Sequence, residues 1–314
     1  MPKGLFTASV CVLFEGLPAL AAVEERLEAA GAVVRGRKEA AGKNPWLGGP
    51  SIVAEMRPEV NGLVTVDLAD MPWPDTMGDP QDRTELFAAW SFGAFGPFVF
   101  PGNLERAAQH AIRWPEAGRT IGAHTGFVRL RSSYVLGQPA DTPVLPEGYD
   151  PLFELRFLTD LASALLALPA SIAFFCPSGE VLSDADQLEG ALRERDQDGM
   201  PPLDVFSNVR FFRIGDAKGW ALMDTVGMEQ LGVTDTEAAF PLDTIEPDAV
   251  AGFLRDLSLF QLNESPTFES GDTIEGPGGI WRASLHETSL VPAPRPTIRW
   301  RPAFGQAPPD DLAS

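Results

Sequence analysis

The sequence predicts an α+β fold with mixed, largely antiparallel sheets and helices packed on one face. Short runs rich in β-branched or aromatic residues, such as 63–68 and 209–214, are bounded by turn residues, which is typical of antiparallel strands. Apolar residues recur at helical spacing over 17–30 and 153–168. The chain has 314 residues, of which 44% are hydrophobic, so it is longer than a usual single domain. We therefore expect either one large domain or two fused and similar halves.

Residues 1–136 are predicted to form an N-terminal α+β half. Apolar and polar residues alternate over 5–14, as in a strand with one buried face. A helix follows over 17–30, and Gly31 ends it. The remaining predicted elements of this half are strands 51–56 and 63–68, helix 104–114 and strand 121–134.

A proline-rich stretch, residues 137–151, is interpreted as the connection between the two halves. The C-terminal half, residues 152–290, is predicted to contain a helix at 153–168, a buried strand at 171–176, a helical segment at 183–195, a helix begun near Pro247 and a hairpin within 274–285. Proline, alanine and aspartate dominate residues 291–314, so we expect a poorly ordered tail.

The most informative stretch of this half is residues 206–240. Its predicted elements are a hairpin of strands 209–214 and 220–223 turned at Gly215-Asp216, a short helix ending near Gly232, and a strand at 235–240. Asp224 and Thr225 are expected to cap the short helix, because their side-chain oxygens can accept its unpaired N–H groups.

An aromatic, glycine-rich segment at residues 76–102, which contains Phe95 and Phe98, allows two interpretations. Trp73 stands just before this segment, between two prolines. Large apolar patches seldom stay exposed, which favours a hydrophobic plug packed against a sheet. The alternative is a partner-binding loop that uses Trp73, Phe95 and Phe98 as contacts.

The composition argues against several classes of partner. A formal net charge of −20 leaves little to neutralise phosphates, so we expect no nucleic acid partner and no binding to anionic membranes. No apolar run is long enough to span a membrane. Cys11 and Cys176 lie in apolar runs and are expected to be buried thiols. The alternating N-terminal segment does not have the pattern of a signal peptide, so we expect a cytoplasmic protein.

Candidate chemistry rests on few residues. The histidines are too widely spaced for the common zinc motifs, and neither a nucleophile elbow nor a phosphate-binding glycine loop is present, so we expect no metal and no cofactor. His124 stands at a predicted strand start, where Asp224 or Glu237 could orient its ring. A structural histidine is the competing interpretation. Asp224 and Thr225 are weak catalytic candidates, because capping also explains them.

Several short motifs together resemble a bacterial domain family of unknown function. They are DLADMPWP at 67–74, Trp114-Pro115, His124 before GFVRL at 126–130, DTVGM at 224–228, Leu231-Gly232 and DTE at 235–237. The resemblance spans roughly residues 5–260. Some members of that family stand near toxin loci, which implies an immunity or accessory role.

These observations lead to one expected function and two alternatives. We expect a non-enzymatic protein that binds another protein, such as a basic toxin, by surface and charge complementarity. The first alternative is a hydrolase or metal-dependent enzyme centred on His124 with Asp224 or Glu237. The second is a structural accessory that dimerises through an open sheet edge.

Overall fold

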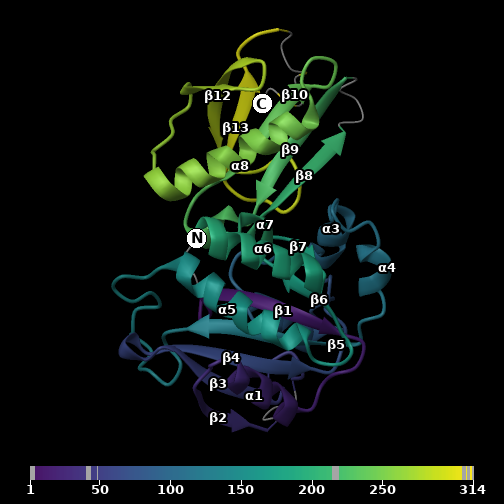
Figure 1. Ribbon diagram of the computed structural model, residues 1–314, viewed down its shortest axis with the longest axis vertical. Helices are drawn as coiled ribbons and strands as arrows, with labels where there is room; N and C mark the ends of the chain where they lie inside the picture. The colour runs from purple at the N-terminus through teal and green to yellow at the C-terminus, as the bar shows by residue number, and fades with distance from the viewer. Residues whose placement is uncertain are drawn as a thin grey trace. The chain divides into compact units, whose positions relative to one another are not determined.

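The chain forms two compact units, Met1–Phe206 and Ser207–Ser314, each with its own sheet (Figure 1). The computed structural model describes residues 4–39, 44–47, 49–213 and 219–305, together with Pro309 and Leu312. The α+β class is confirmed, and both sheets are mostly antiparallel. The units meet in the sequence at Phe206, whereas we expected a connection at 137–151. That stretch instead leads from a strand into a helix of the first unit.

The first unit is built on a seven-stranded antiparallel sheet in the order β2-β3-β4-β5-β1-β6-β7. Its strands are β1 (Ala8–Phe14), β2 (Val34–Lys38), β3 (Ser51–Arg57), β4 (Gly62–Ala69), β5 (Gly126–Ser133), β6 (Ser171–Cys176) and β7 (Val181–Ser183). Its helices are α1 (Leu20–Ala29), α2 (Thr84–Ser91), α3 (Asn103–Gln109), α4 (Ala117–Ile121), α5 (Pro151–Leu166), α6 (Ala185–Asp198) and α7 (Leu203–Phe206). Pro58–Val60 forms a single 3₁₀ turn between β3 and β4.

Helices cover both faces of this first sheet. The α5 helix packs along β1, β5 and β6, and Asp150 caps it by accepting from the N–H groups of Leu152 and Phe153. On the other face, Cys11 and Leu13 of β1 contact an aromatic cluster that includes residues of α2, α3 and α4. Sequence periodicity did not predict α2 and α4, because both helices are short.

A charged cluster fixes two loops onto this second face. Arg129 and Arg131 of β5 both donate to the Asp67 carboxylate on β4, at 2.6 and 2.7 Å. Both arginines also donate to the carbonyl of Ala94, and Arg129 donates to that of Trp46. All three charged side chains are buried. The cluster therefore ties the loops around residues 46 and 94 to the sheet.

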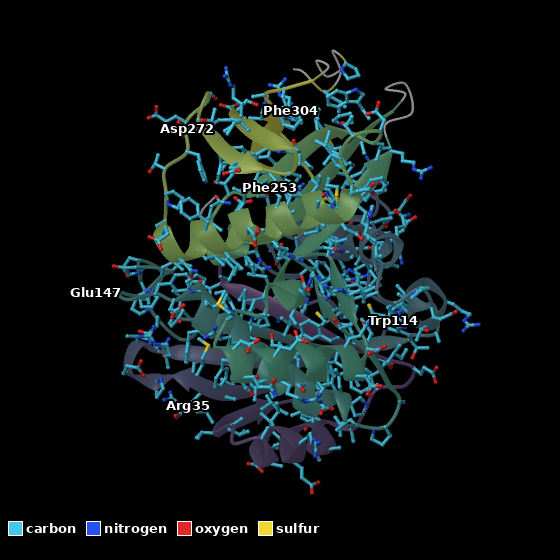
Figure 2. All side chains as sticks on the ribbon, turned by 45° about the horizontal axis from the view of Figure 1, so that its top comes forward. Arg35, Trp114, Glu147, Phe253, Asp272 and Phe304 are labelled. Atoms are coloured by element: carbon cyan, nitrogen blue, oxygen red, sulfur yellow. The ribbon has the colours of Figure 1, made fainter. Side chains whose placement is uncertain are left out.

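The second unit has a six-stranded sheet in the order β11-β12-β13-β10-β9-β8, with β10 and β13 parallel and the other pairs antiparallel. Its strands are β8 (Asn208–Arg213), β9 (Trp220–Val226), β10 (Asp235–Pro241), β11 (Thr273–Gly276), β12 (Gly279–His286) and β13 (Thr297–Pro302). A 3₁₀ turn (Met228–Leu231) and α8 (Pro247–Glu264) complete it. The α8 helix packs on one face of this sheet, and its Phe253 is labelled in Figure 2. The Phe253 ring centroid lies 5.0 Å from that of Trp281 and 6.1 Å from that of Trp300.

Two expectations for this unit are wrong. Asp224 and Thr225 do not cap a helix, because they belong to β9 and the following turn is a 3₁₀ turn flanked by left-handed Gly227 and Gly232. The expected disordered tail contains β13, which occupies a central position between β12 and β10. The predicted turn at Gly215-Asp216 lies outside the described residues.

Candidate functional site: the polar face of the second sheet

The two faces of the second sheet differ sharply in chemistry. Met223, Ala238, Phe240 and Trp300 face α8 and form an apolar core with it. Because side chains alternate along a strand, their neighbours point to the opposite face. That opposite face carries charged and polar residues beside an apolar cluster of Trp220, Leu222 and Ala239, and we call it the polar face. Its charged and polar members here, together with Arg295 just before β13, are Arg210, Asp224, Asp235, Glu237, Ser284, His286, Arg299 and Arg301.

A row of four charged residues, with two carboxylates between two arginines, crosses four neighbouring strands of this face. Strand register places Arg210 beside Asp224, Asp224 beside Glu237, and Glu237 beside Arg299. Arg210 Nε donates to Asp224 Oδ1 at 3.0 Å, and Arg299 Nε donates to Glu237 Oε2 at 3.0 Å. All four side chains are at most 1% exposed. Each carboxylate is therefore compensated inside the protein rather than by water.

Arg295 joins this row to a second carboxylate. The guanidinium donates to Asp224 and, at 3.1 Å, to Asp235 Oδ2. Two backbone carbonyls, those of Thr225 and Ala293, accept its remaining N–H groups. Since Arg295 lies two residues before the first residue of β13, these bonds fix the entry of the chain into that strand.

The Asp235 carboxylate also organises the turn after β9. It accepts from Thr225 Oγ1 at 2.9 Å and from the backbone N–H of Met228 at 3.1 Å. Thr225 Oγ1 in turn accepts from the N–H of Thr236 at 2.9 Å. These bonds hold the 3₁₀ turn against β10, so both Asp235 and Thr225 stabilise the local fold.

Burial and pairing act in opposite directions on the ionisation of these groups. Burial raises the pKa of Asp235, although Arg295 and the Met228 N–H oppose it. Burial likewise raises the pKa of Glu237, and Arg299 opposes it. Burial alone would lower the pKa of Arg295, but Asp224 and Asp235 outweigh it and raise that pKa. The three arginines and three carboxylates of the buried row cancel in charge.

The polar face opens to solvent at its β12 end. Ser284 Oγ lies 2.9 Å from His286 Nε2 and accepts from Arg301 Nη2 at 3.3 Å. Burial, Arg299 and Arg301, in that order, lower the pKa of His286. This end is half-buried rather than enclosed, so it is the part of the face that a ligand can reach.

The sequence candidates for an active site are each held inside their own unit. His124 belongs to the first unit, where its Nε2 accepts from the Trp73 N–H at 2.9 Å and its Nδ1 bonds to the Ile121 carbonyl. Asp224, Thr225 and Glu237 belong to the second unit and are fixed by the bonds described above. Every one of these side chains therefore has a structural role.

The candidate binding residues are mostly in the core. Trp73 is 4% exposed and packs edge-on against Phe95, Phe127 and Phe175. Phe95 is buried as well, so neither ring offers a surface to a partner. Phe98 is half-buried.

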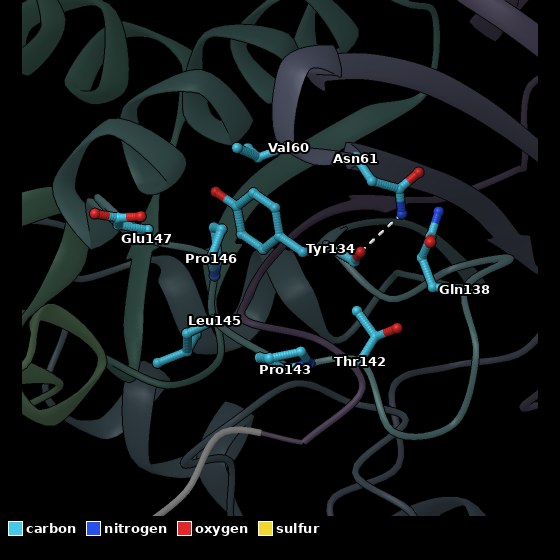
Figure 3. A pocket seen from close by; sticks show the side chains of 9 residues that line it. All are labelled: Val60, Asn61, Tyr134, Gln138, Thr142, Pro143, Leu145, Pro146 and Glu147. Carbon is cyan, nitrogen blue, oxygen red and sulfur yellow. Dashed lines mark hydrogen bonds between the residues drawn. The ribbon is translucent and has the colours of Figure 1, made fainter.

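A shallow groove of about 250 Å³ lies in the first unit, between the turn after β3 and the proline-rich stretch (Figure 3). Its lining residues are Val60, Asn61, Tyr134, Gln138, Thr142, Pro143, Leu145, Pro146 and Glu147. Asn61 Nδ2 donates to the Tyr134 carbonyl at 2.7 Å, so this amide group stabilises the loop rather than facing a ligand. The volume is below the roughly 300–1,000 Å³ of most small-molecule sites.

Sequence reasoning missed Arg210, Arg295, Arg299, Ser284 and His286. Alternation of arginine with apolar residues in VRFFR and TIRWRP was the available signal, because a strand with one core face turns the arginines to the other. No group of three or more metal-ligating side chains occurs in the described part of the chain. Within that same part, no helix has both the length and the apolar character needed to cross a membrane.

Comparison with known proteins gives one match. Residues 224–301 match the family model of a domain of unknown function, DUF4261. This confirms the suspected domain family of unknown function for that range, while the motifs between residues 67 and 130 lie outside it. The matched range contains every charged and polar residue of the polar face named above except Arg210. No curated protein and no solved structure matches the chain.

Proposed function

We propose that this chain is a non-enzymatic binding protein whose partner is a positively charged protein. The observation that carries the proposal is the distribution of its charge. Acidic surfaces attract basic partners over long distances and accelerate their association.

The charged residues of the core nearly cancel. Six carboxylates and five guanidiniums are buried among the described residues: Asp67, Glu154, Glu180, Asp224, Asp235 and Glu237, with Arg129, Arg131, Arg210, Arg295 and Arg299. The formal net charge of the chain is −20. Almost the whole surplus of negative charge therefore belongs to residues outside this buried set.

The α6 helix of the first unit concentrates this surplus. Only Leu188 of α6 is buried. Its exposed carboxylates are those of Asp186, Glu189, Glu194, Asp196 and Asp198. Arg193 and Arg195 pair with Glu189 and Asp196, which leaves an acidic face on the helix. We propose this face as the first contact for the partner.

The resemblance to a family found near toxin loci supports a basic toxin as the partner. Neutralisation by binding requires only a complementary surface, which agrees with the structural roles of His124, Asp224 and Glu237. The cytoplasm is the compartment that we propose, since Cys11 and Cys176 are both buried and neither is part of a disulfide.

Association kinetics test the proposal. The chain is used to capture a basic protein from lysate of its own host, and the rate at which the two purified proteins associate is measured as the salt concentration is raised. We expect a steep fall in rate with ionic strength. Light scattering of the chain alone separates a monomeric binder from the dimeric accessory.

A pair of matched double variants locates the contact. E194Q/D198N removes two exposed charges from α6, and E25Q/E28Q removes two exposed charges from α1. The first is expected to slow association several-fold, and the second to leave the rate within about twofold. An association rate that does not change with salt concentration would contradict the proposal. So would equal changes of that rate in the two double variants.

A further inference from the structure

An apolar patch interrupts the polar face of the second sheet. Strand register places Phe212 of β8 beside Leu222 of β9, and Leu222 beside Ala239 of β10. Trp220 lies two residues before Leu222 on β9 and therefore points to the same face. We call these four residues the apolar floor. It adjoins the charged row, because Asp224 follows Leu222 at the same two-residue spacing.

Three side chains from outside the strands cover the apolar floor. The α8 helix packs on the opposite face of the sheet. On the floor itself, Leu290 and Val291 pack together with Leu312, which comes from a segment beyond β13. Leu312 is 1% exposed, and Trp220, which packs with it, is 5% exposed. The Leu312 side chain therefore shields the floor from water.

Leu312 is the apolar anchor of the segment that carries it. Residues 306–314 read QAPPDDLAS, so Leu312 is their only large aliphatic residue. Its backbone N–H donates to the Pro309 carbonyl at 2.9 Å, which closes a turn within the segment. The contact of Leu312 with the sheet, in contrast, is apolar. This contact can therefore open while the hydrogen bonds between the strands stay intact.

Polar bonds fix the loop that borders the floor. The Glu237 carboxylate accepts from the Leu290 N–H at 2.8 Å, which ties that loop to β10. Ser289 Oγ donates to the Val291 carbonyl at 2.7 Å. The apolar floor thus lies between strands and a loop that are both held in place. Rigid apolar surfaces bordered by polar groups are typical of sites that take up one apolar side chain of a partner.

We propose that the apolar floor is a binding site for a leucine-bearing peptide turn, and that Leu312 occupies it as a displaceable anchor. The residues of this chain that occupy the floor define the ligand: a leucine that closes a turn of proline and aspartate. Because its own segment is tethered, Leu312 acts at a high effective concentration and competes with any peptide from outside. The site lies within the second unit, and the proposal is independent of partner binding by α6.

Peptide binding tests the site. The probe is the fluorescently labelled peptide QAPPDDLAS, and fluorescence anisotropy gives its Kd for the full chain and for L312S. L312S removes the competing side chain, so it should bind the peptide at least about tenfold more tightly than the parent chain. The matched control I280S replaces an apolar side chain that is 48% exposed, and it should bind as weakly as the parent chain. Equal Kd values for L312S and the parent chain would overturn the proposal.

Two further changes test whether the leucine enters the floor. A peptide in which serine replaces the leucine should not bind L312S. In the L312S background, F212A removes part of the floor and should raise Kd about tenfold. F260A, at a phenylalanine of α8 that is 40% exposed, should leave Kd unchanged. If the serine peptide binds as well, or if F212A and F260A have equal effects, the leucine does not bind the floor.

Thiol labelling of the full chain distinguishes a displaceable anchor from a fixed one. In L312C, the buried Cys11 and Cys176 react only when the first unit unfolds and provide the slow reference. N263C, at an exposed position of α8, provides the fast reference. Position 312 should react at an intermediate rate, and free QAPPDDLAS should accelerate its labelling because the peptide takes its place on the floor. Labelling as slow as that of Cys11, with no effect of the peptide, would show that Leu312 is fixed and would overturn the proposal.

Discussion

Arg295 illustrates how one side chain can hold distant parts of a unit together. It bonds carboxylates on β9 and β10 and a carbonyl of its own segment, and it is 4% exposed. Removing one partner from a buried ion cluster leaves the other charges without compensation. The free-energy cost of leaving these charges unpaired is larger than the net stabilisation that the ion pair provides.

R295A is therefore expected to destabilise the second unit by about 3–5 kcal/mol. Urea unfolding at neutral pH measures the change. The matched control is R282A, an exposed arginine of the same unit, which should change stability by less than about 0.5 kcal/mol. Equal effects of the two variants would show that Arg295 is not part of a stabilising network.

Asp67 makes the free energy of unfolding of the first unit depend on pH, and the sign of that dependence follows from its pKa. Burial alone would raise the pKa of this carboxyl, but Arg129 and Arg131 outweigh it and hold the pKa below its ordinary value of 3.8. A carboxyl with a lowered pKa stabilises the folded state above 3.8, and the contribution is lost as pH falls through the folded pKa.

R131M should make the loss of stability at acid pH smaller. With one arginine removed, the pKa of Asp67 moves back toward 3.8, so folded and unfolded states bind protons more equally. Urea midpoints of the first unit, measured from pH 6 down to about pH 3, give the slope of its stability against pH. R119M, at an arginine whose side chain is 82% exposed, should leave the slope as it is. An unchanged slope in R131M would contradict the assignment.

At the scale of elements, the sequence predicts strands and helices that have a local repeat of apolar residues. It does not predict which residues far apart in the chain pair with one another. The periodicity of 235–240 predicted β10 and the correct division of its faces, because Ala238 and Phe240 do face the core. Glu237, on the other face, is buried against Arg299, 62 residues away, and the local pattern gives no sign of that pairing. Asp224 resembled a helix cap because its partners, Arg210 and Arg295, are remote in sequence.

The C-terminal segment shows the same limit. Its proline content is typical of disorder, yet TIRWRP forms β13 by pairing with β10 and β12. Beyond that strand, Leu312 is 1% exposed and packs with Trp220, Leu222 and Ala239. The strand β13 and the Leu312 side chain therefore belong to the core of their unit.

Truncation separates the two contributions of this segment. Ending the chain after Gly305 removes Leu312 and should cost the second unit about 1.5–3 kcal/mol, the usual value for one buried leucine. Ending it after Pro296 removes a central strand and should abolish cooperative folding of that unit. Urea unfolding followed by circular dichroism measures both. A second unit that still unfolds cooperatively after the longer truncation would show that β13 is dispensable.

At the scale of the whole molecule, each unit closes its own core. Leu158 of α5 is fully buried in the first unit, and Leu254 of α8 is fully buried in the core of the second. A segment with its own sheet, helix and apolar core can fold as a cooperative unit. The two cores differ in size, since the first unit has 206 residues and the second has the remaining 108.

We therefore expect two unfolding transitions that respond separately to mutation. L158A and L254A each delete a buried leucine and should cost about 2–5 kcal/mol. L158A should lower the midpoint of one transition and L254A that of the other, as measured by calorimetry. The isolated segment 207–314 should reproduce the transition that L254A affects. If instead one transition is seen and both variants shift it equally, the units unfold together and the division into two cores has no thermodynamic meaning.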